Sequence, residues 1–126
     1  MYLRGTSFAV IPSNGQLDFS HIVPFSSSTN FHPKCFILPA DYNNNQTAVE
    51  QCWLGDDNLP LVDLDTENPE IVKTMQNWIK DLVTTYGVDG LRIDTLKHVG
   101  KDFWPAFASA AGVYTLGEVL IFIFTL

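Results

Sequence analysis

The sequence predicts an α/β fold with a parallel sheet, because two helical patterns alternate with two short apolar stretches in the second half of the chain. Helices are expected over residues 69–86 and 102–111, and strands over residues 88–95 and 113–120. Elements that alternate in this rhythm form parallel strands joined by right-handed crossover connections. Ligands bind such sheets at the carboxyl ends of the strands, so the residues that end the two strands are the first candidates for function.

The first helix has clear boundaries. Asn68 is a suitable N-cap, Pro69 suits the first helical position, and Gly87 can end the helix in the left-handed conformation. The apolar residues between these ends have the spacing of one helical face. They are Ile71, Met75, Trp78, Ile79, Leu82, Val83 and Tyr86.

The three following elements rest on shorter patterns. Leu91 and Ile93 give the first strand its apolar character, and we expect this strand to be buried. The second helix tolerates Pro105 in its first turn and ends at Gly112. The second strand then begins at Val113.

Residues 1–62 are expected to form loops and short strands rather than a helical layer. They contain the runs Ser26-Ser27-Ser28 and Asn43-Asn44-Asn45 and lack a sustained helical period. Prolines interrupt this part repeatedly, and residues of these types favour turns. The prolines are Pro12, Pro24, Pro33, Pro39 and Pro60.

Composition excludes several functions. The 126 residues, 46% of them hydrophobic, are enough for one domain or for part of a larger one. A net charge of −7 without a basic cluster argues against nucleic acid as a partner. No apolar run reaches the roughly 18 residues of a membrane span, and the N-terminus lacks the apolar region of a signal peptide.

The two cysteines, Cys35 and Cys52, have no further Cys or His at metal-ligand spacing, so a zinc site is not expected. On the residues alone, a disulfide and two free thiols are equally open. A disulfide in an oxidising compartment would stabilise the fold by roughly 3 kcal/mol. The glycosylation sequon Asn45-Gln46-Thr47 slightly favours secretion.

Asp94 stands at the end of the first predicted strand. The alternation of a strand puts Arg92 and Asp94 on one face. A buried strand carries such residues only where they pair with each other or with a ligand. Arg92 is expected to lower the pKa of Asp94 and keep it ionised, which suits a nucleophile. A structural ion pair is the equally open alternative.

Glu118 ends the second predicted strand, after Gly117 and among apolar residues, so desolvation is expected to raise its pKa towards that of a general acid. One ionised and one protonated carboxyl group is the division of roles in glycoside hydrolysis. Neighbouring strands lie about 5 Å apart, which matches the ~5–5.5 Å between the carboxyl groups of a retaining enzyme. The alternative, a surface Glu at a strand end, is disfavoured by Asp94 one βα unit earlier.

Several motifs occur in order over about residues 22–120. They are Phe31-His32-Pro33, Cys52-Trp53-Leu54-Gly55-Asp56, Asp63-Leu64-Asp65-Thr66, Asp89-Gly90-Leu91-Arg92-Ile93-Asp94 with Lys97-His98, Phe103-Trp104-Pro105 and Gly117-Glu118-Val119. This set resembles the α-amylase family of glycoside hydrolases, in particular its secreted fungal members. The resemblance implies endo-hydrolysis of α-1,4-glucosidic bonds in starch- and glycogen-type polysaccharides, with retention of configuration.

The resemblance also implies a fold and its divisions. Residues 63–120 would form part of a (β/α)8 TIM barrel, from about the third helix to the fifth strand. Residues 1–62 would form an irregular, β-rich, calcium-binding segment like the family's domain B, in which residues 1–20 match nothing. Residues 121–126 are an atypical apolar tail.

Carried over residue by residue, the resemblance makes Asp94 the nucleophile that forms a covalent glycosyl intermediate. Glu118 would be the general acid/base, and Arg92 would orient the nucleophile and contact the substrate. Lys97 and His98 would contact the substrate as well.

The resemblance further implies a Ca²⁺ ion, with Glu50, Asp63 and the backbone carbonyl of His98 among its oxygen ligands. Without the resemblance, Glu50 and Asp63 would be solvated loop charges. The same likeness implies that Cys35 and Cys52 are disulfide-bonded, although this chain has a few extra residues between them.

The departures from the family pattern bear on activity. The family's third catalytic carboxylate and its upstream Asn-His motif have no match. A complete barrel takes about 250 residues, and part of a barrel leaves open sheet edges. We therefore expect the isolated chain to be inactive and the complete enzyme to be an extracellular monomer. The alternatives are a non-catalytic calcium- or carbohydrate-binding fragment, and an α-glucosidase or transglycosylating relative.

Overall fold

The computed structural model describes residues 17–119. The chain divides into two compact units, one that ends at Asp65 and one that begins at Thr66. The expected apolar tail over residues 121–126, the end of the second predicted strand at Leu120 and most of residues 1–20 lie outside the described part. No helix within residues 17–119 is long and apolar enough to cross a membrane.

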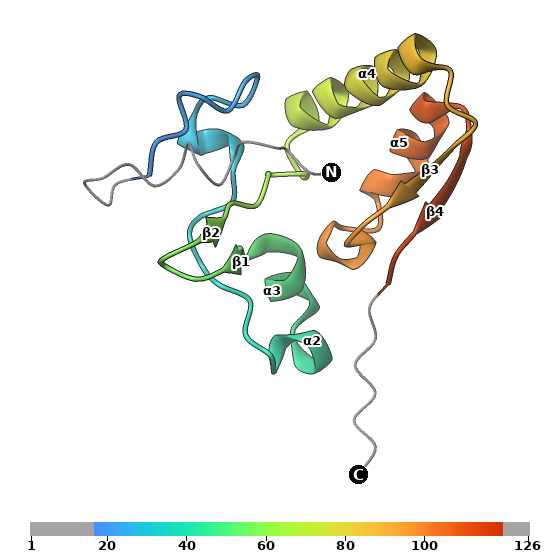
Figure 1. Cartoon of the computed structure of the whole chain (residues 1–126). Helices are drawn as coiled ribbons and strands as arrows, with labels where there is room; N and C mark the ends of the chain where they lie inside the picture. Colours follow the sequence, from blue (N-terminus) through green and yellow to red (C-terminus); the bar gives the residue numbers. More distant parts are fainter. Residues whose placement is uncertain (1–16, 120–126) are drawn as a thin grey trace. The chain divides into compact units, whose positions relative to one another are not determined.

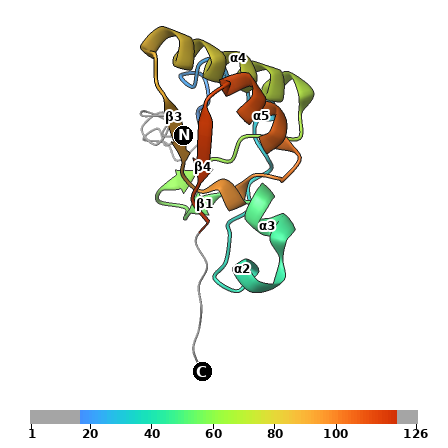
Figure 2. The same cartoon turned by 90° about the vertical axis from the view of Figure 1, so that its right-hand side faces the viewer.

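The second unit has the predicted order of helix, strand, helix and strand (Figure 1). Its elements are α4 (Pro69–Tyr86), β3 (Gly90–Ile93), a 3₁₀ helix (Leu96–His98), α5 (Phe103–Ala111) and β4 (Tyr114–Gly117). β3 and β4 lie side by side in both views (Figures 1 and 2), and α5 packs against α4. The α/β prediction is confirmed for this unit.

Helix α4 has the boundaries that its sequence predicts. The Asn68 side chain accepts a hydrogen bond of 3.0 Å from the backbone N–H of Glu70. Gly87 ends the helix at a φ of 58°, and its N–H donates to the carbonyl of Val83. The face that the helix buries contains Ile71, Met75 and Ile79. Helix α4 packs against α5, whose buried residues are Phe103, Phe107 and Ala111.

The Asn68 cap supports a first prediction. Asn68→Ala should lower the free energy of unfolding by about 1 kcal/mol, because the N–H of Glu70 loses its acceptor. Chemical denaturation followed by helical circular dichroism measures this loss. Asn77→Ala, at an exposed position in the middle of the same helix, is the matched control and should raise the midpoint slightly, because Ala has the higher helix propensity. Equal midpoints for the two variants would show that the cap contributes nothing.

The two strands of this unit form a parallel pair in which Gly90 lies opposite Tyr114 and Ile93 opposite Gly117. Both strands are shorter than expected. β3 ends at Ile93, because the chain then turns at Thr95 at a φ of 50°. The expectation of a fully buried strand was wrong. Every second residue of β3 is exposed, and the others are half-buried.

The first unit is built of short elements. They are a 3₁₀ helix (Ser28–Asn30), α2 (Asp41–Asn44), α3 (Gln46–Gln51), and the antiparallel pair β1 (Leu54–Gly55) and β2 (Pro60–Leu61). The short strands were expected, whereas the two helices were not. Asn43 and Asn44 lie in α2, and Asn45 caps the start of α3, because its side chain accepts a hydrogen bond from the N–H of Ala48.

The core of the first unit lies around Trp53, which is 2% exposed. Its indole N–H donates to the carbonyl of His32 at 3.0 Å, and its backbone N–H donates to the carbonyl of Cys35 at 2.7 Å. Cys35 is disulfide-bonded to Cys52. The disulfide that the family resemblance implies is therefore confirmed. It links the segment at Cys35 to the residue directly before Trp53.

Candidate active site

The carboxyl ends of β3 and β4 bring Asp94 and Glu118 to the same edge of the sheet. The N–H of Glu118 donates to the carbonyl of Ile93 at 2.7 Å, which extends the parallel ladder by one residue. The N–H of Leu96 donates to the carbonyl of Glu118 at 3.1 Å. These two bonds hold Glu118 beside the short segment that contains Asp94.

Each of the two carboxyl groups shifts the pKa of the other. Hydrogen bonding between them is the largest cause that holds the pKa of Asp94 below its usual value, and it is also the largest cause that raises the pKa of Glu118. The backbone N–H of Thr95 donates to Asp94 Oδ1 at 2.9 Å and favours the ionised form further. The pair is thus arranged to hold one proton, on Glu118, beside an ionised Asp94.

The raised pKa of Glu118 has a different cause from the one expected. Desolvation was expected to dominate, but it comes after the hydrogen bond to Asp94 and the negative charge of Asp94. The Glu118 side chain is 40% exposed, so burial removes little of its hydration. A neighbouring carboxylate acts more strongly here than an apolar surrounding.

Arg92 pairs with a different partner from the one expected. Its Nη2 atom lies 3.0 Å from Glu118 Oε1, whereas sequence analysis paired it with Asp94. The register explains this, because Arg92 lies opposite Leu116 and its long side chain reaches the residue two positions further along. The charge of Arg92 still lowers the pKa of Asp94, but as a lesser cause than the hydrogen bond from Glu118.

Lys97 and His98 lie in the 3₁₀ helix directly after Asp94. The backbone N–H of His98 donates to the carbonyl of Thr95 at 2.9 Å, and its Nδ1 atom lies 3.3 Å from the same oxygen. A carbonyl only accepts, so this contact requires a proton on Nδ1. Burial lowers the pKa of His98, which favours the neutral imidazole.

The expected calcium ligands belong to different elements of the chain. Glu50 is in α3, where its carboxylate accepts a hydrogen bond of 2.6 Å from the side chain of Gln46. Asp63 follows β2 and holds His32 through a 2.7 Å contact between Oδ2 and Nδ1. His98 belongs to the second unit.

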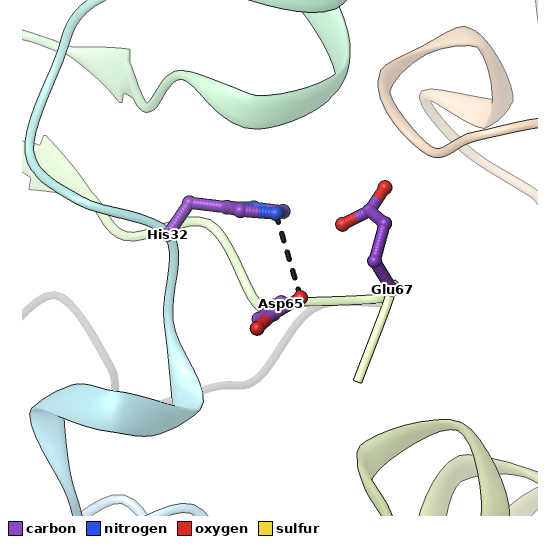
Figure 3. A group of neighbouring side chains, drawn as sticks. All are labelled: His32, Asp65 and Glu67. Atoms are coloured by element: carbon purple, nitrogen blue, oxygen red, sulfur yellow. Dashed lines mark ion pairs between the residues drawn. The ribbon is translucent and has the colours of Figure 1, made fainter. Parts of the chain in front are cut away.

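Three neighbouring side chains could bind a metal ion and were not among the residues predicted from the sequence (Figure 3). His32 Nε2 lies 3.6 Å from Asp65 Oδ1, and ligand atoms of His32, Asp65 and Glu67 all lie within 4.8 Å of one another. Imidazole and carboxylate groups are common metal ligands. The alternation of Asp63, Asp65 and Glu67 was the available signal, but nothing in the sequence placed His32 beside it.

Comparison with known proteins gives this geometry a context. The family description "Alpha amylase, catalytic domain" matches residues 18–113, a range that includes Arg92 and Asp94 and ends before Glu118. Alpha-amylase 1 of Lipomyces kononenkoae is 50% identical over 112 residues, which are 89% of this chain and 18% of that protein. Alpha-amylase 2 of Schizosaccharomyces pombe is 41% identical over 104 residues, 82% of this chain and 17% of that protein.

Solved structures agree with the sequence relatives. An α-amylase from Malbranchea cinnamomea superposes with a TM-score of 0.75 at 48% identity and covers 82% of this chain and 21% of its own. The α-amylase from Geobacillus thermoleovorans, complexed with acarbose, gives a TM-score of 0.60 at 37% identity, over 71% of this chain and 20% of its own. The chain thus spans about a fifth of the length of these proteins. It belongs to the α-amylase family of glycoside hydrolases, and the match lies in the family's catalytic domain.

Proposed function

We propose that this segment supplies two catalytic carboxyl groups to an enzyme that hydrolyses α-1,4-glucosidic bonds within starch- and glycogen-type polysaccharides. The observation that carries the proposal is the position of Asp94 and Glu118 directly after two adjacent parallel strands, where the N–H of Glu118 donates to the carbonyl of Ile93 and each carboxyl group shifts the pKa of the other. Adjacent strands lie about 5 Å apart, which matches the ~5–5.5 Å between the carboxyl groups of a retaining enzyme and leaves no room for the water molecule that an inverting enzyme places between substrate and base. The pair therefore favours retention of configuration.

In the proposed reaction, Asp94 attacks the anomeric carbon while Glu118 gives its proton to the leaving glycosidic oxygen. The bond between the anomeric carbon and the glycosidic oxygen breaks, and a covalent ester forms between the anomeric carbon and the Asp94 carboxylate. Glu118, now ionised, takes a proton from a water molecule, whose oxygen displaces Asp94 from the anomeric carbon. The lowered pKa of Asp94 and the raised pKa of Glu118 suit these roles.

The neighbouring residues have supporting roles in the proposal. Arg92 lies beside Glu118, with its Nη2 atom 3.0 Å from Oε1, and its positive charge stabilises the carboxylate that Glu118 becomes after it gives up its proton. Lys97 and His98, in the turn after Asp94, contact the bound glucan. In the complete protein, residues 63–120 form the third helix to the fifth strand of a (β/α)8 barrel, and residues 1–62 form a domain B. The disulfide and the exposed sequon at Asn45 support an extracellular location.

A segment exchange tests the proposed function. Residues 18–119 replace the matching segment of the Malbranchea cinnamomea α-amylase, and the purified exchange protein is assayed on soluble starch and on a chromogenic maltooligosaccharide. We expect reducing-sugar release, with a first product of unchanged anomeric configuration by ¹H NMR. We expect no release from the 126-residue chain alone, because part of a barrel leaves sheet edges open. A folded but inactive exchange protein would contradict the proposal.

A metal ion is part of the proposal, with Ca²⁺ held by Glu50, Asp63 and the backbone carbonyl of His98, as the resemblance implies. Carboxylates and carbonyls are the ligands that Ca²⁺ prefers.

In the exchange protein, Ca²⁺ at 100 times its Kd should add about 2.7 kcal/mol to the free energy of unfolding. Glu50→Gln with Asp63→Asn should abolish this gain. Asp65→Asn with Glu67→Gln tests the group in Figure 3. If only this second pair removes the gain, the ligands are those of Figure 3.

The coupling of the two carboxyl groups predicts a specific pH response. The reaction needs ionised Asp94 and protonated Glu118, so activity falls below the lowered pKa of Asp94 and above the raised pKa of Glu118. In Asp94→Asn, Glu118 loses the largest cause of its raised pKa while Arg92, which lowers it, remains. The pKa of Glu118 should therefore fall, as read from ¹³C NMR of its carboxyl carbon. Asp89→Asn, at the other end of β3, is the control. An unchanged pKa in Asp94→Asn would refute the coupling.

A further inference from the structure

The chain makes an unusual turn directly after Asp94. Thr95 has a φ of 50° and a ψ of 34°, in the left-handed region. Within residues 17–119 it is the one residue other than glycine with a positive φ. A β-branched residue is a genuine outlier there, and such strain persists where the surrounding contacts over-determine it.

The turn makes three contacts that reach both carboxylate residues. The N–H of Thr95 donates to Asp94 Oδ1 at 2.9 Å. The N–H of Leu96 donates to the carbonyl of Glu118 at 3.1 Å. The third contact is between the Leu96 side chain and Gly117, the residue before Glu118. A Cβ atom added to Gly117 would lie 2.0 Å from Leu96 Cδ1 and 2.9 Å from Leu96 Cγ.

We infer that the left-handed turn at Thr95 and the packing of the Leu96 side chain on Gly117 act together as one positioning device. This device sets the separation of the Asp94 and Glu118 carboxyl groups. The inference rests on the proposed function and adds Thr95, Leu96 and Gly117 as positioning residues. Gly117 is needed because any side chain there would displace Leu96. Leu96 in turn carries the N–H that holds the backbone of Glu118.

The central test is Gly117→Ala in the exchange protein. The added methyl group must move Leu96, and with it the carbonyl of Glu118 that accepts from the N–H of Leu96, so the separation of the two carboxyl groups changes. Displacement of a catalytic group by about 1 Å can cost on the order of 100-fold in rate. We expect a loss of this size in kcat with KM nearly unchanged, together with a fall in the pKa of Glu118 by ¹³C NMR. Leu96→Ala with Gly117→Ala should recover most of kcat, because the two nearest Leu96 atoms are then absent.

Gly90→Ala is the matched control, since Gly90 lies at the other end of the same strand pair. Its added Cβ meets the backbone oxygen of Tyr114 at 3.2 Å, so it strains the same sheet away from the carboxyl groups. It should lower Tm without moving kcat or the pKa of Glu118. If Gly117→Ala behaves in the same way, the contact is structural only and the inference is wrong.

The inference and the proposed function can fail separately. An inactive but folded wild-type exchange protein would count against the function, and the NMR titration of Glu118 in Gly117→Ala would still test the device. An active wild-type protein in which Gly117→Ala leaves kcat and the pKa of Glu118 unchanged would overturn the device alone. Recovery by the double variant distinguishes repositioning from general damage to the fold.

Discussion

Asp94→Asn is expected to lower kcat of the exchange protein by on the order of 10⁴-fold or more, as removal of a nucleophile does in enzymes whose catalytic groups act as a unit. The amide cannot form the ester with the anomeric carbon. Glu118→Gln should cost less, about 10²- to 10⁴-fold, because it removes only proton transfer. Initial rates on soluble starch measure both losses, and circular dichroism checks that both variants are folded.

The two roles can be separated by the choice of substrate. α-Maltosyl fluoride has a leaving group that needs little help from an acid, so Glu118→Gln should form the covalent intermediate with it. Mass spectrometry should then detect a glycosylated protein. Asp94→Asn should form no such adduct, whichever leaving group the substrate carries. A maltosyl adduct on Asp94→Asn would show that the nucleophile is another residue.

Loss of the disulfide is the second large effect. Cys35→Ser with Cys52→Ser should lower the free energy of unfolding of the first unit by about 3 kcal/mol, since the bridge restricts the unfolded chain. The disulfide lies beside Trp53, which is 2% exposed. Urea denaturation followed by tryptophan fluorescence therefore reports on this region in a background that carries Trp78→Phe and Trp104→Phe, which removes the other two tryptophans of the chain.

The reduced wild type serves as the control for the disulfide variant. A reducing agent should shift the urea midpoint of the wild type to that of the double serine variant and leave the variant unchanged. A variant as stable as the oxidised wild type would mean that the packing around Trp53 maintains the fold without the bridge. Cys35→Ala with Cys52→Ala removes the bond without adding hydroxyl groups and therefore separates the two effects.

The second unit could be predicted closely because its signals are local. Asn68, Pro69 and Gly87 define α4 through caps and fixed backbone angles. Gly112 likewise ends α5 at a φ of 66°. The parallel pairing of β3 and β4 followed from the alternation of elements. Asp94 and Glu118 could be placed together for the same reason, since parallel strands present their carboxyl ends at one edge.

The errors concern side-chain reach and local capping, which residue spacing does not encode. Arg92 and Asp94 share a face of β3, but the register with β4 brings the guanidinium group to Glu118. The Asn45 cap turns a polar run into the start of α3. The contact between His32 and Asp63 joins residues far apart in sequence, and no pattern within either segment predicts it.

Both proposed catalytic residues come from one strand, helix and strand unit, joined through α5. Loop closure over so short a stretch of chain costs little entropy, and contacts of small sequence separation form early in folding. The two carboxyl groups can therefore meet before distant parts of a larger barrel have docked. Substitutions in α5 or at the ends of β3 and β4 would then alter the order of assembly as well as the finished site. Pulsed hydrogen exchange at the N–H groups of Leu96 and Glu118 would reveal this change in the order of assembly.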